Sequence, residues 1–303
     1  MTIEWQGTFP AITTPFTERG AVDHDFLAEH SRTLIGAGCA GIIALGSLGE
    51  GATLDAAEKR AILATVIGAV SAPVVAGIAA LSTDDAVALA RAAEAAGCRG
   101  LMVLPPYVYS TDEREMHAHV SAVIDATALP CMLYNNPPAY RTDFTPPQIV
   151  RLAERHANLV AVKESSGDVR RITALRALAG DRLAIAIGLD DLVVEAVAAG
   201  AVAWVAGLVN ALPRESVALF ERARRGEHDR AAALYHWMLP LLRMDTVPKF
   251  VQLIKLVQHH VGLGSARVRA PRLALEGAEL AEAEATIRAA LDQAPAGDRR
   301  VAL

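Results

Sequence analysis

One unit recurs along this chain and restricts what it can fold into: a helix, then Ala-Gly, then a short apolar strand. Residues 26–38 lead into the apolar run 40–45, residues 86–97 into 99–104, and residues 192–200 into 201–205. The glycine that ends each helix suits the left-handed position after a helix. Each short link then leads into the next strand, as in parallel α/β folds.

Five further apolar runs complete the series, at residues 9–13, 74–77, 132–134, 160–163 and 183–187. They do not alternate between polar and apolar residues, which is typical of strands covered on both faces. Helix start signals lie between them at Thr53, Ser82, Thr111 and Thr145. Eight β/α units by about residue 225 predict an α/β fold, the (β/α)₈ or TIM barrel, rather than an open sheet.

After residue 225 the pattern changes. Residues 229–243, 247–261 and 279–291 predict three helices with no strand between them. We therefore predict a barrel domain over residues 1–225 and a C-terminal helical extension over residues 226–303. The second of these helices carries a broad apolar stripe, which can cover the wall of its own barrel or another subunit.

Composition and charge narrow the classes of partner. The net charge of −5 gives no support for nucleic acid or a membrane as partner. The three cysteines form no CxxC or His/Cys cluster, so neither a disulfide framework nor a zinc site is predicted. No signal-peptide pattern opens the chain, and we expect a cytoplasmic protein. No GxGxxG or GxxxxGK[ST] follows a strand, so a nucleotide-binding fingerprint is absent.

Lys163 is the most informative single residue. It ends the apolar run 159–162 and precedes a Ser-Ser-Gly turn, so its stem lies among apolar neighbours at the end of a buried strand. Desolvation there lowers an amine pKa, and a neutral lysine amine can form a Schiff base. The alternative is a structural lysine whose charge reaches solvent or pairs with Glu164.

Other strand ends carry groups that suit the same chemistry, because barrel enzymes place their sites at this edge. Residues 46–51 read Gly-Ser-Leu-Gly-Glu-Gly, which is either a carboxylate cradle or an ordinary glycine turn. Residues 134–137 read Tyr-Asn-Asn-Pro, in which Tyr134 is either a proton shuttle or a core tyrosine. Glu50 is expected to bond within its own loop, and Asp190-Asp191 to cap a helix rather than bind a metal.

These three motifs, in this order, resemble the signature blocks of the dihydrodipicolinate synthase / N-acetylneuraminate lyase family, and the resemblance covers nearly the whole chain. It implies a class I aldolase-type Schiff-base enzyme that needs no metal or other cofactor and assembles as a homotetramer, a dimer of dimers. By this resemblance Lys163 forms the Schiff base and Tyr134 shuttles protons, while Ser47 and the Leu48 backbone hold a carboxylate. The remaining expected substrate contacts are Gly46, Tyr107, Asn136, Gly188 and Leu189.

The chain also departs from the synthases of that family. They carry two hydroxyl residues in the glycine block, where this chain has Ser47 followed by Leu48. They carry an arginine five residues after the tyrosine, where this chain has Ala139 and the nearest arginine is Arg141. The match for their intersubunit tyrosine is Tyr107 or the residue after it. The Gly-Ser-Leu-Gly-Glu and Tyr-Asn-Asn-Pro variants resemble those of 1-pyrroline-4-hydroxy-2-carboxylate deaminases of hydroxyproline catabolism, which release 2-oxoglutarate semialdehyde and ammonia.

Other functions stay open at this point. One is a dihydrodipicolinate synthase or a 2-keto-3-deoxy sugar acid aldolase or dehydratase. Another, of a different class, is a sensor barrel that binds a keto acid without turnover, against which the intact Lys163 and Tyr134 argue. In each case the expected partner is a small 2-oxo acid or cyclic imino acid.

Overall fold

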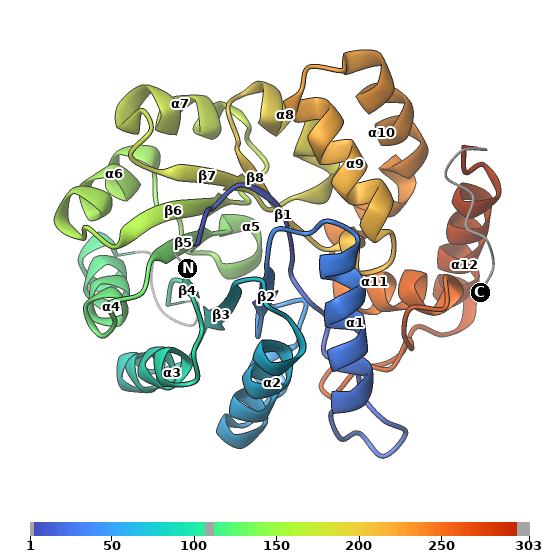
Figure 1. Ribbon diagram of the computed structural model, residues 1–303, viewed down its shortest axis with the longest axis horizontal. Coiled ribbons are helices and arrows are strands. Elements are labelled where there is room, and N and C mark those ends of the chain that lie inside the picture. Colours follow the sequence, from blue (N-terminus) through green and yellow to red (C-terminus); the bar gives the residue numbers. More distant parts are fainter. Residues whose placement is uncertain (1–2, 107–111, 296–303) are drawn as a thin grey trace.

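The computed structural model describes residues 3–106 and 112–295, and a parallel eight-stranded barrel lies at its centre (Figure 1). The strands are β1 (Gly7–Pro10), β2 (Ile42–Ala44), β3 (Val74–Ile78), β4 (Gly100–Val103), β5 (Cys131–Asn135), β6 (Leu159–Glu164), β7 (Ala184–Ile187) and β8 (Ala203–Ala206). Their hydrogen-bonded order is β1-β8-β7-β6-β5-β4-β3-β2. A parallel bridge between Ala11 and Ile43 joins the two outer strands. The predicted barrel is therefore confirmed.

Helices surround these strands in Figure 1. They are α1 (His24–Gly36), α2 (Ala56–Ala69), α3 (Thr83–Ala95), α4 (Glu113–Asp125), α5 (Pro137–Tyr140), α6 (Pro146–Arg155), α7 (Arg170–Ala179), α8 (Val193–Ala198) and α9 (Pro213–Arg224). Single 3₁₀ turns follow β2, β7 and β8, namely η1 (Gly51–Thr53), η2 (Asp190–Leu192) and η3 (Leu208–Asn210). These turns lie at the carboxyl ends of the strands, where the candidate site is built.

The helix start signals were partly right. Ser82 caps α3, and Thr145 forms a capping box at the start of α6, as predicted. Thr53 was wrong as the start of α2, because the side chain of Asp55 accepts the first amide hydrogens instead and Thr53 lies in η1. Thr111 lies outside the described residues.

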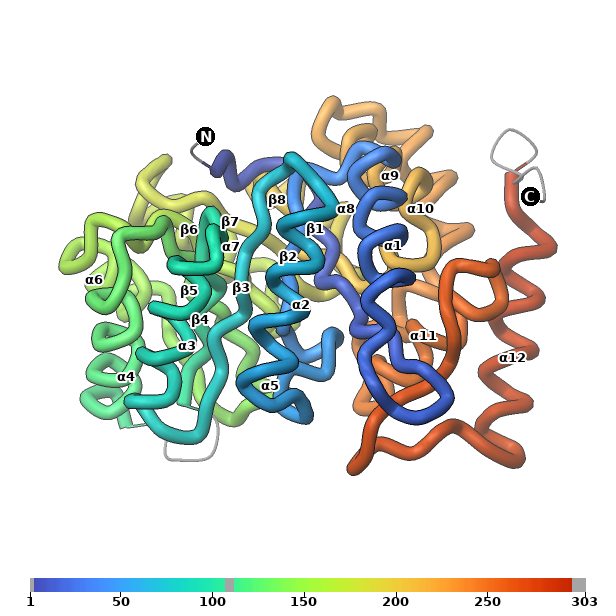
Figure 2. Tube along the Cα trace, turned by 60° about the horizontal axis from the view of Figure 1, so that its bottom comes forward, coloured from blue at the N-terminus to red at the C-terminus, as the bar shows by residue number. Residues whose placement is uncertain are grey.

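Three more helices follow, as predicted: α10 (His228–Leu242), α11 (Phe250–His260) and α12 (Gly277–Asp292). They lie together on one side of the barrel, beside α1 and α9 (Figures 1 and 2). On α11, Val251, Ile254 and Val257 are buried in the hydrophobic core of this same chain. The apolar stripe therefore covers this chain's own core and is no argument for a subunit contact. The division into two domains at residue 225 stays a prediction. The helix before that residue, α9, packs against the helix after it, α10.

Two further properties concern the described residues as a group. Cys39, Cys98 and Cys131 are buried and free, as expected of small core side chains. Across residues 3–106 and 112–295, every helix is too short or too polar to cross a membrane.

Candidate active site

Lys163 and Tyr134 meet at the carboxyl end of the barrel. They are paired neighbours on β6 and β5, so both side chains project from the same level of the sheet. The Lys163 amine lies 4.1 Å from the centroid of the Tyr134 ring. Both side chains are buried, 6% and 5% exposed respectively. The arrangement brings a lysine amine and a tyrosine phenol together in a buried position at the end of the barrel.

The surroundings of Lys163 favour the neutral amine. Burial lowers its pKa from 10.5 to about 8, and this effect exceeds the opposing influence of Asp245 and Asp190. Gly188 packs directly on the lysine stem, since a Cβ there would lie 2.2 Å from Lys163 Cε. Gly188 was expected to contact substrate. The structure shows that the absence of a side chain at Gly188 leaves room for the stem of Lys163.

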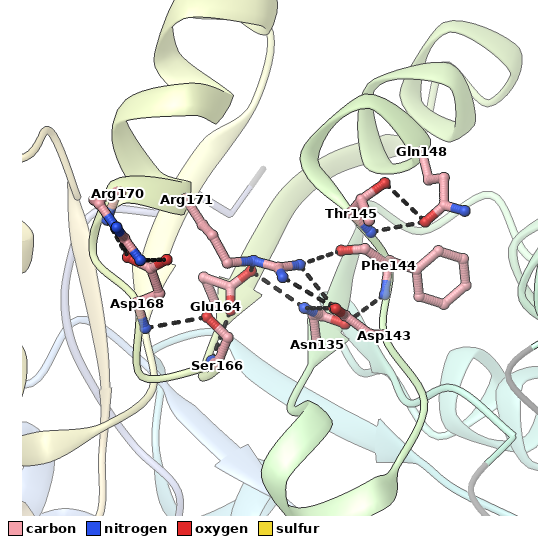
Figure 3. A network of polar contacts seen from close by, with 10 residues as sticks. All are labelled: Asn135, Asp143, Phe144, Thr145, Gln148, Glu164, Ser166, Asp168, Arg170 and Arg171. Atoms are coloured by element: carbon pink, nitrogen blue, oxygen red, sulfur yellow. Dashed lines mark hydrogen bonds and ion pairs between the residues drawn. The ribbon is translucent and has the colours of Figure 1, made fainter.

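Glu164, the neighbour of Lys163, does not pair with the lysine. In Figure 3 its carboxylate faces Arg171, and the Nε–Oε2 distance is 3.3 Å. Asn135, the neighbour of Tyr134, donates to both Glu164 and Asp143, and Arg171 also pairs with Asp143 at 2.8 Å. The structural alternative of a Lys163–Glu164 pair is therefore wrong. The network ties β5 to β6 next to both site residues.

Tyr134 has partners that fix its ring and hydroxyl. Asn136 Nδ2 donates to the hydroxyl oxygen at 2.9 Å. Burial raises the phenol pKa, the Asn136 bond opposes that rise, and the charge of Asp245 adds to it. Tyr134 therefore holds its proton when no substrate is bound. Asn136, expected to contact substrate, contacts Tyr134 in this structure.

Tyr140 also enters the site, which the sequence analysis did not single out. Its ring packs edge-on against Tyr134, with centroids 5.7 Å apart and planes at 86°. Its hydroxyl hydrogen-bonds with Ser47 Oγ. The sequence signal was an aromatic residue in the loop after Tyr134. Only the short helix α5 turns it back toward the glycine loop, whereas Arg141 is exposed and makes no ion pair among the described residues.

The glycine loop of residues 46–51 follows β2. Gly46 lies close above β3, because a Cβ on Gly77 would come within 3.0 Å of its amide nitrogen. Ser47 is partly buried, and Leu48 is 3% exposed and belongs to the core. The prediction for Glu50 was wrong. Its side chain leaves its own loop and forms a fully buried ion pair with Lys255 on α11, at 2.6 Å.

The prediction that Asp190 caps its own helix was also wrong. Its carboxylate accepts from Trp204 Nε1 at 2.8 Å and from the backbone amides of Gly207 and Leu208 at 3.1 and 2.7 Å. Asp190 therefore ties β7 to the end of β8. Burial raises its pKa to about 6, although these hydrogen bonds oppose the rise. Among the described residues, no three His, Cys, Asp or Glu side chains cluster as a metal site.

Two expected substrate contacts remain, Leu189 and Tyr107, and only Leu189 lies in the described part of the chain. Leu189 lies in the β7 loop, and its Cδ1 would be 3.8 Å from a Cβ on Gly167, in the turn after Lys163. Ser165, also in that turn, has a fully buried hydroxyl with no hydrogen-bond partner in the described part of the chain. Tyr107 lies outside the described residues.

Comparison with known proteins agrees with this geometry. The model of the dihydrodipicolinate synthetase family matches residues 4–290. The chain belongs to this family. A 4-hydroxy-tetrahydrodipicolinate synthase from Sorangium cellulosum is 35% identical over 268 residues, covering 88% of this chain and 89% of that relative. The synthase of Methanothrix thermoacetophila is 31% identical over 268 residues, covering 88% and 90%.

Solved structures show the same family fold. A dihydrodipicolinate synthase from Bacillus anthracis has a TM-score of 0.90 at 28% identity, covering 97% of this chain and all of that one. A family member from an E. coli K12 prophage, solved in complex with pyruvate, has a TM-score of 0.89 at 27% identity, covering 94% and 98%. The family resemblance is confirmed. The relatives are named as synthases, so they lend the deaminase assignment no support.

Proposed function

We propose that this family enzyme forms a Schiff base at Lys163 and deaminates 1-pyrroline-4-hydroxy-2-carboxylate. The observation that carries the proposal is the contact that the loop after β5 makes with Ser47. The hydroxyl of Tyr140 hydrogen-bonds to Ser47, and Ala139 stands where the family's synthases carry an arginine. A second substrate carboxylate, as in aspartate semialdehyde, finds no guanidinium there. A substrate with one carboxylate and a hydroxyl fits better.

The reaction begins with addition of the neutral Lys163 amine to C2 of the cyclic imine. The C2–N bond of the ring breaks, which leaves an imine between C2 and Lys163 and a free amine on C5. Ser47 and the backbone N–H of Leu48 hold the carboxylate. The substrate thus becomes an open chain bound covalently through an electron-withdrawing iminium.

Tyr134 gives its proton to the ring nitrogen as the C2–N bond breaks, and so becomes a phenolate. The iminium acidifies the proton on C3, and the Tyr134 phenolate removes it. The electron pair expels the 4-hydroxyl, which leaves as water. A proton shift converts the C5 amine to an imine, and water releases ammonia and the aldehyde. A second water frees Lys163. Overall one water is consumed, and the products are 2-oxoglutarate semialdehyde and ammonia.

The second candidate is 4-hydroxy-tetrahydrodipicolinate synthase, favoured by the names of the curated relatives. Lys163 and Tyr134 would serve it equally well. The two functions differ in what the pocket must bind after the Schiff base forms. Leu48 lacks the second hydroxyl of the synthase block, and Arg141 is exposed.

A paired assay separates the candidates. Purified enzyme is given 1-pyrroline-4-hydroxy-2-carboxylate with ammonia release monitored, and separately pyruvate with aspartate semialdehyde in a coupled synthase assay. We expect rapid ammonia release and poor synthase turnover. Efficient synthase turnover with no ammonia release would reverse the ranking. Absence of both, with pyruvate still trapped by borohydride at Lys163, would leave the aldolases or a keto-acid sensor as the function.

We also propose the homotetrameric assembly that the family resemblance implies. The apolar stripe of α11 no longer supports it, because that stripe is covered within the chain. Sedimentation at micromolar concentration tests it directly against the 32.0 kDa mass of one chain.

A further inference from the structure

Asp245 reaches the barrel mouth from the C-terminal helices. It ends η4 (Arg243–Asp245), the turn that links α10 to α11. Its carboxylate presses against Gly207 at the end of β8, since a Cβ on Gly207 would lie only 2.0 Å from Asp245 Oδ1. Any side chain at position 207 would therefore displace the carboxylate. The chain therefore has a glycine where this acid lies against the end of β8.

The same carboxylate acts electrostatically on both proposed catalytic groups. Its charge raises the pKa of the Lys163 amine and the pKa of the Tyr134 phenol. Burial raises the pKa of Asp245, repulsion from Asp190 and Asp191 adds to the rise, and the charge of Lys163 opposes it. Asp245 therefore lies at the carboxyl end of β8, two strands from Lys163 on β6, and its charge acts on both Lys163 and Tyr134.

Asp245 differs from its neighbour Asp190 in having no hydrogen-bond donors. Asp190 accepts from Trp204 and from two backbone amides, which fixes it as a structural link. Within residues 3–106 and 112–295, no hydrogen bond or ion pair engages the carboxylate of Asp245. An acid in a largely enclosed position without protein donors is suited to exchange a proton with a ligand.

We propose that Asp245 is the general acid that protonates the 4-hydroxyl of the substrate as it leaves. This role rests on the proposed deaminase function. After Tyr134 has taken the C3 proton, the electron pair of that bond forms C2=C3. As the C2 iminium re-forms, the electrons shift to C3=C4 and the C4–O bond breaks. Asp245 gives its proton to the departing oxygen, so water leaves and the carboxylate remains. The proton that leaves C5 as the C5 amine becomes an imine, or exchange with solvent, restores the acid.

Raised pKa values near this mouth fit the direction of transfer. Burial and two neighbouring aspartates raise the pKa of Asp245, although Lys163 opposes the rise, and a raised carboxyl pKa makes proton donation closer to neutral pH more favourable. The positions of Tyr134 and Asp245 assign them to different proton transfers. Tyr134, beside Lys163, serves the carbon next to the imine, and Asp245, over β8, serves the oxygen farther along the chain.

The test compares Asp245→Asn with Asp191→Asn as a matched control. Both variants remove one acid from the same region, but Asp191 does not press on Gly207. Each is assayed on 1-pyrroline-4-hydroxy-2-carboxylate and on its 4-chloro analogue, whose chloride leaves without protonation. Pyruvate trapping at Lys163 by borohydride reports whether each variant still forms the Schiff base. The charge of Asp245 raises the pKa of Lys163, so its loss in Asp245→Asn lowers that pKa. The variant therefore does not increase the protonated fraction of the lysine amine.

We expect Asp245→Asn to lose about 10²–10³-fold on the hydroxy substrate. It should stay within a few-fold of wild type on the chloro analogue and in pyruvate trapping. Asp191→Asn should lose much less than Asp245→Asn on the hydroxy substrate, because Asp191 acts only by raising the pKa of Asp245. Equal losses on both substrates would assign Asp245 a structural role and overturn the proposal, as would full activity of Asp245→Asn on the hydroxy substrate. A wild-type enzyme that traps pyruvate but turns over neither compound would refute the deaminase function itself, and this role with it.

Discussion

Raising the pH from 7 to 9 should increase Schiff-base formation at Lys163 by about tenfold and then have no further effect. Burial places the pKa of Lys163 at about 8 instead of 10.5, a difference of about 3 kcal/mol against the charged form. The neutral fraction is then about 9% at pH 7 and about 91% at pH 9. A lysine without this shift would be about 0.03% neutral at pH 7 and about 3% at pH 9, a hundredfold rise that continues upward.

The assay takes a short incubation with pyruvate at each pH, reduction of the imine, and mass spectrometry of the peptides. The chain suits it, because it has only four lysines: Lys59, Lys163, Lys249 and Lys255. The exposed Lys249 serves as the internal reference for a side chain in solvent. The midpoint measured is that of the interacting group formed by Lys163 with Asp190 and Asp245.

Two results would refute the reasoning. Trapping at Lys163 that still rises tenfold per pH unit above pH 9 would mean that burial does not lower the pKa of this amine. Trapping confined to another lysine, in an enzyme that is active, would mean that the Schiff base forms elsewhere. Either result would remove the basis for assigning Lys163 as the nucleophile.

Three further changes test the site and its support. Tyr134→Phe should keep pyruvate trapping but lower turnover by about 10²–10⁴-fold, because the proton carrier is lost; turnover near wild type would assign proton transfer to another group. Gly188→Ala should lower trapping by about 10²-fold, since its Cβ would lie 2.2 Å from Lys163 Cε; unchanged trapping would show that the lysine stem can move aside. Lys255→Met should lower the free energy of unfolding by about 3 kcal/mol in urea titrations, because Glu50 loses the buried ammonium and keeps only the Arg269 amide and the more distant Arg272. Adding Glu50→Leu should restore part of the loss, and equal stability of wild type and Lys255→Met would contradict a stabilising pair.

What the sequence could predict depended on how local the signal was. The barrel was predictable because each helix-to-strand unit carries its own pattern of apolar residues and a closing glycine. Lys163 and Tyr134 were predictable for the same reason, since each ends a strand and parallel strands end at one rim. Ser82 and Thr145 were right as caps because capping involves residues only three positions apart.

Contacts between distant segments were not predictable in this way. Glu50 finds Lys255, which is 205 positions away, and a glycine-rich turn gives no sign of that partner. Asp190 looked like a helix cap because the pattern around it is that of a helix start. The amides that it accepts from belong to the loop after β8, and only the closed barrel brings them close. Tyr140 required the short helix α5 to turn it toward Ser47.

The C-terminal helices belong to the site as much as the barrel does. Lys255 on α11 holds Glu50, and so holds the end of the glycine loop proposed to bind the substrate carboxylate. Lys255 also donates to the carbonyl oxygens of Thr14 and Arg267, both at 2.7 Å, so one buried ammonium joins the first strand's loop, the glycine loop and the segment after α11. Asp245 reaches the mouth from the turn just before α11. A division of the chain at residue 225 therefore separates two patterns of secondary structure, but the proposed chemistry draws on both sides of it.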